Sequence, residues 1–540
     1  MKKNGIIILS AILIVGIIAA EKIQGSIKPE EVDPYAVTRN QQHVEAMANG
    51  ADPSLGTAEI PEDYIVDESF ESHLPLVVID IKNQEIPITK IFETIDEERK
   101  DVKIVRTGED PFVNGNISII DNENYVNHLG DEPVTKSNMK IRYRGNSSLN
   151  YAKKQFAIKM LNEAGESTKV DVMGMGENND WILNISMIDQ SLIRNYMAYN
   201  LGSTMFPYTP DVKYCEVFFK SANGYEYQGL YLMMEKVEKG DDRVKLDTYT
   251  PGDKYASYLL CRDREDEKDV QLDTYGNQNG LSYGRLSVLY PDEEILDENA
   301  LNYITQDIDN IERIIYSDDP EIFETWSEYL DLDSFVDYFL FNELFGNYDA
   351  GNNSTYMYKN GAGKLCMGPL WDYDGAMDNY SSQLNNISNM SFVDASYYDR
   401  LIRSRLFIET SQKRYKDMVN STFSTEELGK YIDDVSRFLG NAALRDWSRW
   451  ASMYGKKSLM TTLPDAEGYD VDRSRDDWSG EVQRLKDYFS IKELYMENGL
   501  RDLEINIVDM KTTNGAYLGM FTIILMICLV VLIGRRKMFR

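Results

Sequence analysis

Strand-like and helix-like hydrophobic patterns occupy different parts of the chain. Leu74 to Ile81 is an almost continuous apolar run rich in Val and Ile, and Phe112 to Ile120 and Lys140 to Tyr143 continue as short strand-like segments between turn residues. Farther along, apolar residues recur at a helical period in two segments, Leu301 to Ile315 and Leu332 to Leu344. The pattern predicts an α+β protein with a β-rich N-terminal portion and a helical C-terminal portion.

Apolar segments at the two ends predict membrane elements. Residues 5–20 are almost wholly apolar and follow two lysines, so we expect residues 1–20 to form a signal peptide or an uncleaved signal-anchor. Residues 516–534 form a second apolar run followed by arginines and a lysine, so residues 515–540 are predicted to be a transmembrane helix with a basic cytoplasmic tail. Because basic flanks stay in the cytoplasm, the main body is expected on the extracytoplasmic side.

The chain between these ends divides into four predicted parts. Residues 21–72 mix Pro, Gly, Gln and acids without an apolar period, which predicts an acidic linker without a core. Residues 73–135 are expected to form the β-rich N-terminal portion, and residues 136–460 the core that carries the chemistry. Residues 461–514 begin with acids, Gly and Ser, and are expected to form a helical and loop stalk.

The charge of the chain narrows the choice of partners. The 540 residues include 57 Lys and Arg against 89 Asp and Glu, a net charge of −32. Such a surface repels phosphate backbones, so nucleic acid is excluded as a partner, whereas a metal ion or a basic protein is favoured. With four cysteines and no C-x-x-C pair, the chain also lacks the residues for a disulfide scaffold or a structural zinc site.

Two acidic loops carry the strongest candidate chemistry. Asp349 follows the predicted helix, and Asp372 lies farther along in the sequence Trp-Asp-Tyr-Asp. Short strands at Thr355 to Tyr358 and Lys364 to Met367 would form a hairpin that brings the two carboxylates to one end of a sheet. Hard oxygen ligands there suit Mg²⁺ or Ca²⁺, and this is the equipment of phosphoryl transfer. The alternative is that both loops are ordinary Asp- and Asn-rich turns.

Basic residues that could bind a nucleotide's phosphates lie earlier. Arg144 precedes a turn of small residues, Gly145 to Ser148, and the strand after it contains Lys153, Lys154 and Lys159. These four side chains compete for the same role. For Lys159 the alternative is a solvent-facing residue on a half-buried strand, because it alternates with apolar neighbours. The turn itself is a candidate phosphate site through its backbone N–H groups.

The ordered set of motifs resembles the CotH family of spore-coat-type atypical protein kinases. The similar region covers roughly Leu74 to Phe438, and it makes residues 136–460 a CotH-like kinase core. The motifs are Arg144 to Ser148, Asp180 to Leu183, Asp189 to Asn195, Tyr227 to Glu235, Asn342 to Asp349 and Trp371 to Asp374.

The resemblance implies a divergent two-lobed protein-kinase-like fold that uses ATP and Mg²⁺ or Mn²⁺ to phosphorylate proteins, including spore-coat proteins. It implies that Asp349 is the catalytic aspartate and Asp372 the metal-binding aspartate. Further expected metal ligands are Asp374 and either Asn352 or Asn353. The expected cofactor-binding residues are Arg144, Lys153, Lys154, Lys159 and Glu235, the last of these in the segment that connects the lobes.

Three features depart from ordinary kinases. No G-x-G-x-x-G-x-V motif precedes the basic strand, and no His-Arg precedes Asp349. The helix expected at Gln190 to Leu201 contains no Glu that could pair with the strand lysine. The phosphates must therefore be held in another way.

The sequence thus predicts a membrane-anchored kinase that transfers the γ-phosphate of ATP to Ser or Thr of a protein. Its acidity favours basic acceptor proteins. The alternative is a catalytically inactive module of the same fold that serves in surface adhesion or coat assembly. A hydrolase that uses Asp349 and Asp372 as acid and base is a third possibility.

Overall fold

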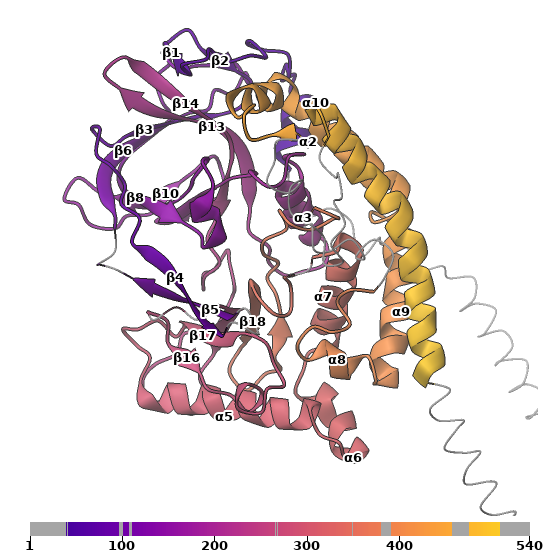
Figure 1. The fold of residues 1–540 in the computed structure, drawn as a ribbon. Coiled ribbons are helices and arrows are strands. Elements are labelled where there is room, and N and C mark those ends of the chain that lie inside the picture. Colours follow the sequence, from indigo (N-terminus) through magenta and orange to yellow (C-terminus); the bar gives the residue numbers. More distant parts are fainter. Residues whose placement is uncertain are drawn as a thin grey trace, which may run out of the picture. The chain divides into compact units, whose positions relative to one another are not determined.

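The N-terminal half is built on a sheet that closes on itself (Figure 1). The computed structural model describes residues 39–507 apart from 40, 97–100, 107, 109–110, 265, 267, 348, 380–389 and 456–474. The strands of the sheet pair in the order β14–β12–β9–β8–β6–β3–β13, and β13 then pairs with β14 again. Within this circuit only the pairing of β3 with β13 is parallel. The strands, including β1 at the edge of β14, are β1 (Ile65–Val66), β3 (Leu76–Asp80), β6 (Val113–Ile120), β8 (Thr135–Arg144), β9 (Gln155–Leu161), β12 (Asp180–Asn184), β13 (Val212–Ser221) and β14 (Gly224–Glu235).

Smaller elements surround this sheet. A hairpin of β4 and β5 follows β3, and the helix α3 lies between β12 and β13 in the chain. The elements are α2 (Gln42–Ala48), β2 (Glu71–Ser72), β4 (Lys90–Asp96), β5 (Asp101–Arg106), β7 (Asn127–His128), the 3-10 helix η1 (Ser147–Asn150), β10 (Val170–Asp171), β11 (Glu177–Asn178) and α3 (Arg194–Gly202).

A second sheet and most of the helices form the C-terminal half. The sheet has the strand order β16–β17–β15–β18–β19. Its strands are β15 (Tyr258–Asp263), β16 (Gln271–Leu272), β17 (Arg285–Tyr290), β18 (Thr355–Lys359) and β19 (Cys366–Met367). The helices are α4 (Tyr275–Gln278), α5 (Glu298–Ile315), α6 (Pro320–Phe323), the 3-10 helix η2 (Glu324–Glu328), α7 (Leu332–Phe345), α8 (Tyr398–Leu401), α9 (Arg405–Val419) and α10 (Thr425–Arg449), followed by a helix over residues 478–507.

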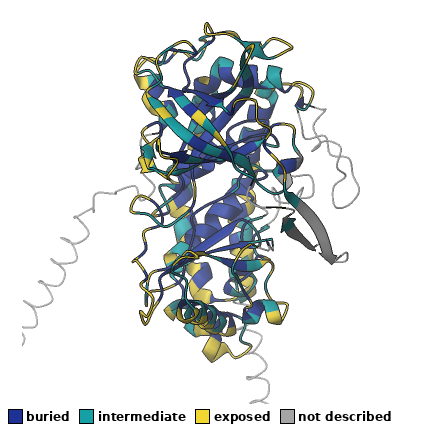
Figure 2. Cartoon of the chain, turned by 90° about the vertical axis from the view of Figure 1, so that its left-hand side faces the viewer, coloured by how far each residue is buried: buried dark blue, intermediate teal, exposed yellow. Residues whose placement is uncertain are grey.

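The two helices predicted from apolar periodicity are α5 and α7. The side chain of Asp297 accepts a hydrogen bond from the Ala300 N–H and caps the start of α5, and Asp331 does the same for Ser334 at the start of α7. α5 buries one face only, whereas every residue of α7 from Phe335 onward is buried. Figure 2 shows buried segments of the chain in dark blue and exposed ones in yellow. α7 therefore lies inside the fold, and the loop that follows it starts from a rigid position.

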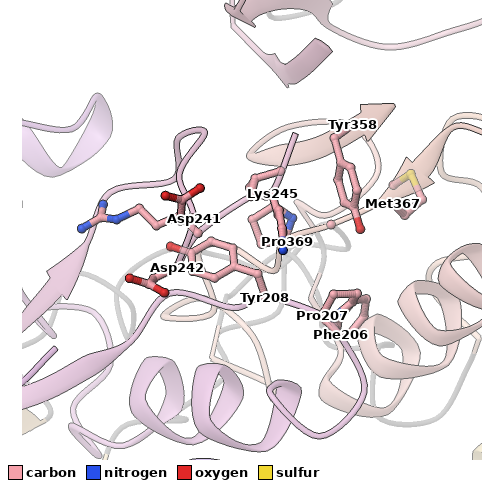
Figure 3. A pocket seen from close by; sticks show the side chains of 12 residues that line it. Phe206, Pro207, Tyr208, Asp241, Asp242, Lys245, Tyr358, Met367 and Pro369 are labelled. Carbon is pink, nitrogen blue, oxygen red and sulfur yellow. The ribbon is translucent and has the colours of Figure 1, made fainter. Parts of the chain in front are cut away.

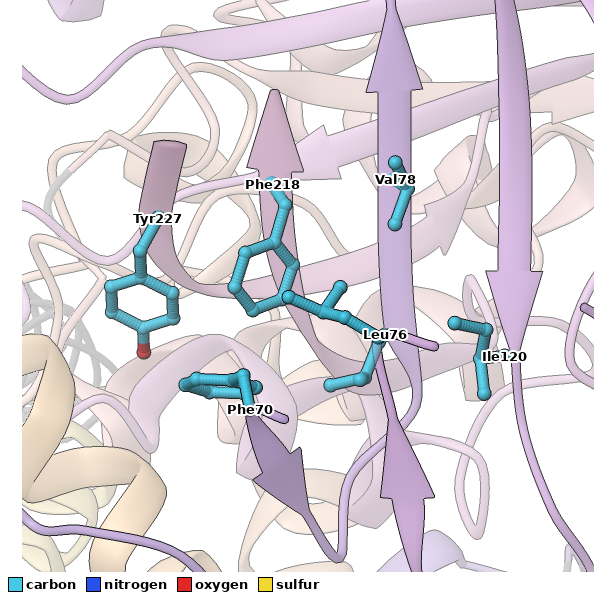
Figure 4. Close-up of a cluster of buried hydrophobic side chains, with 7 residues drawn as sticks. Phe70, Leu76, Val78, Ile120, Phe218 and Tyr227 are labelled. Atoms are coloured by element: carbon cyan, nitrogen blue, oxygen red, sulfur yellow. The ribbon is translucent and has the colours of Figure 1, made fainter. Parts of the chain in front are cut away.

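An aromatic cluster forms part of the core beneath the closed sheet (Figure 4). The ring of Phe218 packs edge-on against Phe70, with 4.9 Å between ring centroids, and lies 5.3 Å from the ring of Tyr227. The buried members of the cluster are Phe70, Leu76, Val78, Ile120, Leu129, Phe218 and Tyr227. Phe70 belongs to the segment that was expected to have no core.

The prediction that residues 21–72 form a linker without a core is wrong for residues 41–72. This part contains α2, β1 and β2, and it buries Phe70, Ala46 and His43. Its apolar residues form only short, scattered groups, so they show no sustained period of their own. They complete a core that other strands build, and sequence periodicity does not detect such a contribution.

Two buried ion pairs fasten α10 to the closed sheet. Arg445 and Glu216 approach to 2.7 Å, and Lys153 and Asp446 also approach to 2.7 Å, with all four side chains inaccessible to solvent. The Tyr227 hydroxyl adds a hydrogen bond to Glu216 at 2.7 Å. Removing one partner from such a pair leaves a buried unpaired charge, so these contacts strongly couple the helix to the sheet.

The helix over residues 478–507 is also part of the fold, although residues 461–514 were expected to form a stalk. Lys492 of this helix lies 3.5 Å from Glu343 of α7, and both side chains are fully buried. The Tyr488 hydroxyl donates a hydrogen bond to the Leu344 carbonyl at 3.1 Å. The helix therefore covers α7.

The fold class is α+β, as predicted, with the strand-rich portion first and most helices later. Within the described residues no helix has the length and apolar character needed to cross a membrane. The predicted apolar segments at residues 5–20 and 516–534 lie outside the described residues.

Candidate active site

The loop after α7 presents Asp349. α7 ends at Gly346, whose φ of 58° lies in the left-handed region that glycine adopts without a steric cost. The chain then forms a tight turn in which the N–H groups of Asn352 and Asn353 donate to the Asp349 carbonyl, at 3.2 and 2.8 Å. Asp349 is thereby fixed at the exit of the most buried helix of the C-terminal half.

The second acidic loop follows β19 and presents Asp372. Asp372 has a φ of 62°, a left-handed conformation that is uncommon for residues other than glycine. Two hydrogen bonds hold it there. Its N–H donates to the Tyr199 hydroxyl oxygen at 3.0 Å, and its carbonyl accepts from the Asn347 side-chain amide at 3.2 Å. The backbone of Asp372 is therefore held by its surroundings, and its carboxylate accepts from the Ser354 hydroxyl at 3.4 Å.

Helix α3 holds the same loop at two further points. The side-chain oxygen of Asn195 accepts from the Tyr373 N–H at 2.8 Å, and Arg194 Nε donates to the Ala376 carbonyl at 3.0 Å. Arg194 is itself fixed by a buried ion pair with Asp189 at 2.6 Å. The Asp189 to Asn195 motif was noted in the sequence without a role. The polar residues Arg194 and Asn195 at the start of an otherwise largely apolar helix were the sequence signal that could have indicated this positioning role.

One cavity of about 550 Å³ contains both aspartates. Of the ten predicted site residues it brings together Arg144, Lys159, Asp349, Asp372 and Asp374, drawn from the closed sheet and from the C-terminal half. Residues for which the sequence predicted no role also line it, among them Lys90, Arg142, Asp180, Asp263, Arg264 and Trp371. Asp180 and Trp371 belong to motifs of the resemblance, whereas Lys90, Asp263 and Arg264 come from segments outside these motifs.

Three of the predicted phosphate-binding or cofactor-binding residues do not line this cavity. Lys153 is fully buried, and its ammonium group donates to Asp446 and to the Leu230 carbonyl. Lys154 donates to the Leu149 carbonyl at 2.6 Å. Glu235 accepts from the Asp211 N–H at 2.9 Å. Their partners belong to the scaffold, so these three side chains are held away from the cavity.

Arg144 and Lys159 enter the cavity from neighbouring strands. The Arg144 guanidinium lies 5.0 Å from the ring centroid of Trp371, the residue before Asp372. Lys159 lies 3.8 Å from Asp180, and 44% of its side chain is exposed. Both cations therefore remain accessible to an anionic ligand.

The small-residue turn after Arg144 also borders the cavity. Gly145, Asn146 and Ser148 are among its lining residues. Lys90 of the β4–β5 hairpin donates to the Gly145 carbonyl at 3.2 Å and to the Asn146 side chain at 3.0 Å. The hairpin thus holds the turn in place from outside the motif region.

The carboxylates of the cavity repel one another. Burial, together with the charge of Asp372, raises the pKa of Asp349 from its usual 3.8 to about 6, although nearby Arg264 opposes the shift. Burial, and then the charge of Asp372, also raises the pKa of Asp374 well above its usual value. A cation bound between these groups would offset the repulsion.

The donors at this site suit a hard divalent cation such as Mg²⁺ or Mn²⁺. Among the described residues no group of three or more His, Cys, Asp or Glu is placed to hold a metal ion by itself. A metal here would therefore need amide oxygens and phosphate oxygens besides Asp372. Neither Asn352 nor Asn353 is among the residues that line the cavity. Asn353 fits better than Asn352, because its side-chain amide donates to Asp349 at 3.4 Å, whereas the Asn352 side-chain oxygen already accepts from the N–H and hydroxyl of Ser396.

A second, smaller cavity of about 280 Å³ lies elsewhere (Figure 3). It is lined by Phe206, Tyr208, Tyr358 and other residues, with Asp241 and Asp242 at one side. None of the predicted site residues lines it, so the larger cavity is the candidate active site.

A comparison with protein families decides the family. The model described as CotH kinase protein matches residues 141–496, more than half of the chain. The chain belongs to the CotH family. The match includes both acidic loops, α3 and the strands that carry Arg144 and Lys159, so the cavity is largely a feature of the CotH region. Lys90 and Phe112, which also line it, precede the matched residues. No curated protein gives a match to the chain.

Proposed function

We propose that this CotH family member is an atypical protein kinase that transfers the γ-phosphate of ATP to Ser or Thr hydroxyls of protein substrates. The observation that carries the proposal is the meeting of Asp349 and Asp372 in one cavity with the accessible cations Arg144 and Lys159. Kinase chemistry needs a carboxylate for the acceptor hydroxyl, a carboxylate for the metal, and cations for the phosphates. The cavity supplies all three kinds of group.

Asp349 would serve as the catalytic base. With a pKa of about 6 it is mostly ionised at neutral pH, and it can still take a proton readily. The acceptor oxygen forms a bond to the γ-phosphorus while the bond from that phosphorus to the β–γ bridging oxygen breaks. The hydroxyl proton moves to Asp349, and ADP leaves.

Asp372 would hold a divalent cation with help from Asn353 and Asp374. The hydrogen bonds from its N–H to Tyr199 and to its carbonyl from Asn347 fix its backbone before a metal arrives. When bound, the cation neutralises phosphate charge. The carboxylates of Asp349, Asp372 and Asp374 then repel each other less, so electrostatics also favours the metal-bound state.

Arg144, Lys159 and the turn of Gly145 to Ser148 would contact the nucleotide phosphates. They belong to the closed sheet, whereas the acidic loops belong to the C-terminal half. This division supports a divergent, two-lobed, kinase-like arrangement in which one part holds ATP and the other carries the catalytic carboxylates. The turn would replace the glycine-rich loop of ordinary kinases, and Lys90 of the hairpin would hold the turn in position through its two hydrogen bonds.

The substrate and location are proposed from charge and sequence. The net charge of −32 favours basic acceptor proteins, and coat or surface proteins fit the family. We propose that the apolar segments at residues 5–20 and 516–534 keep the protein at a membrane with its main body on the extracytoplasmic side. Protease treatment of intact cells, followed by detection of the C-terminal tail and the main body separately, tests this topology.

A nucleotide-binding measurement tests the proposed function. The full-length protein is titrated with Mg-ATP in a calorimeter, and Asp372→Ala serves as the variant that should lose metal-dependent binding. The control is Asp241→Ala, which lines only the smaller cavity. We expect wild type and the control to bind and Asp372→Ala not to bind. No binding by wild type at millimolar Mg-ATP would contradict the kinase and favour the adhesion or coat-assembly module.

A further inference from the structure

Arg264 is a cation of the cavity that the phosphate-binding set does not include. It directly follows β15, and its N–H donates to the Asp263 carboxylate at 2.7 Å. It lines the cavity together with Asp349 and Asp372, and it is half-buried. It comes from the C-terminal half, as the acidic loops do, and not from the sheet that carries Arg144 and Lys159.

The guanidinium of Arg264 makes no ion pair within the described part of the chain. Two fully buried arginines, by contrast, form direct ion pairs. Arg194 pairs with Asp189 at 2.6 Å, and Arg445 pairs with Glu216 at 2.7 Å, each in direct contact. Arg264 is close enough for its charge to lower the pKa of Asp349 and of Asp263, but it lies beyond ion-pair distance from both. The cation therefore borders the same cavity as the catalytic carboxylate without a direct ion pair to it.

We propose that the Arg264 guanidinium binds the phosphoryl group while it passes from ATP to the acceptor hydroxyl. This inference rests on the proposed kinase function. The transferred group carries its charge on three equatorial oxygens, and a planar guanidinium can bind two of them side by side. Negative charge on these oxygens develops next to the catalytic base, and Arg264 offers a cation there that is not paired with the base.

The other cations are less suited to this role. Arg144 stacks over Trp371 and donates to Gln155 at 3.4 Å, and Lys159 is held near Asp180. Both lie with the sheet, on the side proposed for ATP. Arg264 should therefore add little to ground-state nucleotide binding and much to the transition state.

A transition-state analogue separates these contributions without relying on turnover. Full-length wild type, Arg264→Ala and Arg264→Lys are titrated with Mg-ADP, first alone and then with aluminium fluoride, which mimics the phosphoryl group in transfer. The control is Arg403→Ala, an exposed residue that only donates to the Asp399 carbonyl. Phosphate transfer to a Ser-containing basic peptide is measured in parallel.

We expect Arg264→Ala to bind Mg-ADP within about twofold of wild type and to lose on the order of 100-fold in affinity for the aluminium fluoride complex. Its transfer rate should fall by a similar factor. Arg264→Lys should keep the fold and recover only part of both losses, because an ammonium binds phosphate oxygens one at a time. The Arg403→Ala control should match wild type.

Two results would overturn the inference while leaving the kinase proposal intact. One is an Arg264→Ala variant that keeps analogue affinity and transfer rate within about twofold of a wild type that binds Mg-ADP. The other is an equal loss of Mg-ADP and analogue affinity in both substitutions, which would make Arg264 a ground-state ligand. Failure of wild type to bind Mg-ADP at all would overturn the proposed function itself.

Discussion

The backbone N–H of Asp372 donates a hydrogen bond to the hydroxyl oxygen of Tyr199, with 3.0 Å between the nitrogen and the oxygen. Tyr199 is buried in α3, and Asp372 has a left-handed backbone, so the bond joins a rigid helix to a strained loop position. The carboxylate proposed to bind metal is thus positioned by a residue that contributes no ligand itself. Tyr199 also lines the cavity, and loss of its hydroxyl should affect function chiefly through Asp372.

Tyr199→Phe tests this relationship. Removing the hydroxyl leaves the Asp372 N–H without its acceptor, which costs about 1–2 kcal/mol and loosens the loop. We expect the affinity for Mg-ATP to fall by about three- to tenfold, as measured by calorimetry. Tyr415→Phe is the matched control, since its hydroxyl also donates one hydrogen bond, to the Glu493 carbonyl, but far from the acidic loops. Equal Mg-ATP affinity in Tyr199→Phe and wild type would contradict the positioning role.

The charge of Asp349 should destabilise the fold. Its pKa in the folded protein is about 6, above the usual 3.8, so the protonated form is favoured on folding and ionisation at neutral pH costs stability. Asp349→Asn should therefore raise the free energy of unfolding at pH 7.5 by about 1–2 kcal/mol. The gain should shrink as the pH falls through 6 and vanish near pH 4. A variant less stable than wild type at pH 7.5 would contradict this account of the site.

The same pKa predicts the acid side of the activity profile. Only ionised Asp349 can accept the hydroxyl proton, so kcat/KM for Mg-ATP should fall about tenfold per pH unit below about pH 6 and level off above it. Initial rates between pH 5 and 8 at Mg-ATP concentrations well below its KM measure this limb, because they report the enzyme before the cation binds. The residual activity of Asp349→Asn should lack it. A profile that stays flat for wild type down to pH 5 would argue against Asp349 as the base.

Substitution by methionine should affect stability at Lys153 and Mg-ATP binding at Lys159. Lys153→Met leaves Asp446 buried without its cation, which should lower the free energy of unfolding by roughly 3–5 kcal/mol. Lys159→Met removes an accessible cation and should change stability by less than about 0.5 kcal/mol while weakening Mg-ATP binding. Denaturant unfolding and calorimetry on both variants check the pair. A stable Lys153→Met protein that no longer binds Mg-ATP would return Lys153 to the phosphate site.

Elements with a strong local pattern were predictable from sequence. β3, β6, α5 and α7 lie where alternating or helical hydrophobic periods place them. The second sheet was only partly foreseen, because β15 pairs with β18, a strand distant in sequence, and local patterns do not show such a pairing. Residues 41–72 were missed for a related reason, since their buried side chains complete a core built elsewhere.

The candidate site was likewise predictable only where a local sequence pattern marked its residues. Asp349 and Asp372 could be found because each lies in a short, recognisable loop beside a predicted element. Lys153 and Lys159 could not be distinguished, since both are lysines near one strand, and only packing shows that one is paired with Asp446 and the other borders the cavity. Arg264 and Lys90 reach the cavity through tertiary contacts of segments without a motif.

The most direct test of the central claim is transfer of radiolabelled γ-phosphate from ATP to basic Ser-containing peptides by the full-length protein with Mg²⁺. The account predicts incorporation by wild type, a loss of about 10²- to 10⁴-fold in Asp349→Asn with Mg-ATP binding retained, and a loss in Asp372→Ala that accompanies loss of Mg-ATP binding. An Asp349→Asn protein that labels the peptide as fast as wild type would contradict it.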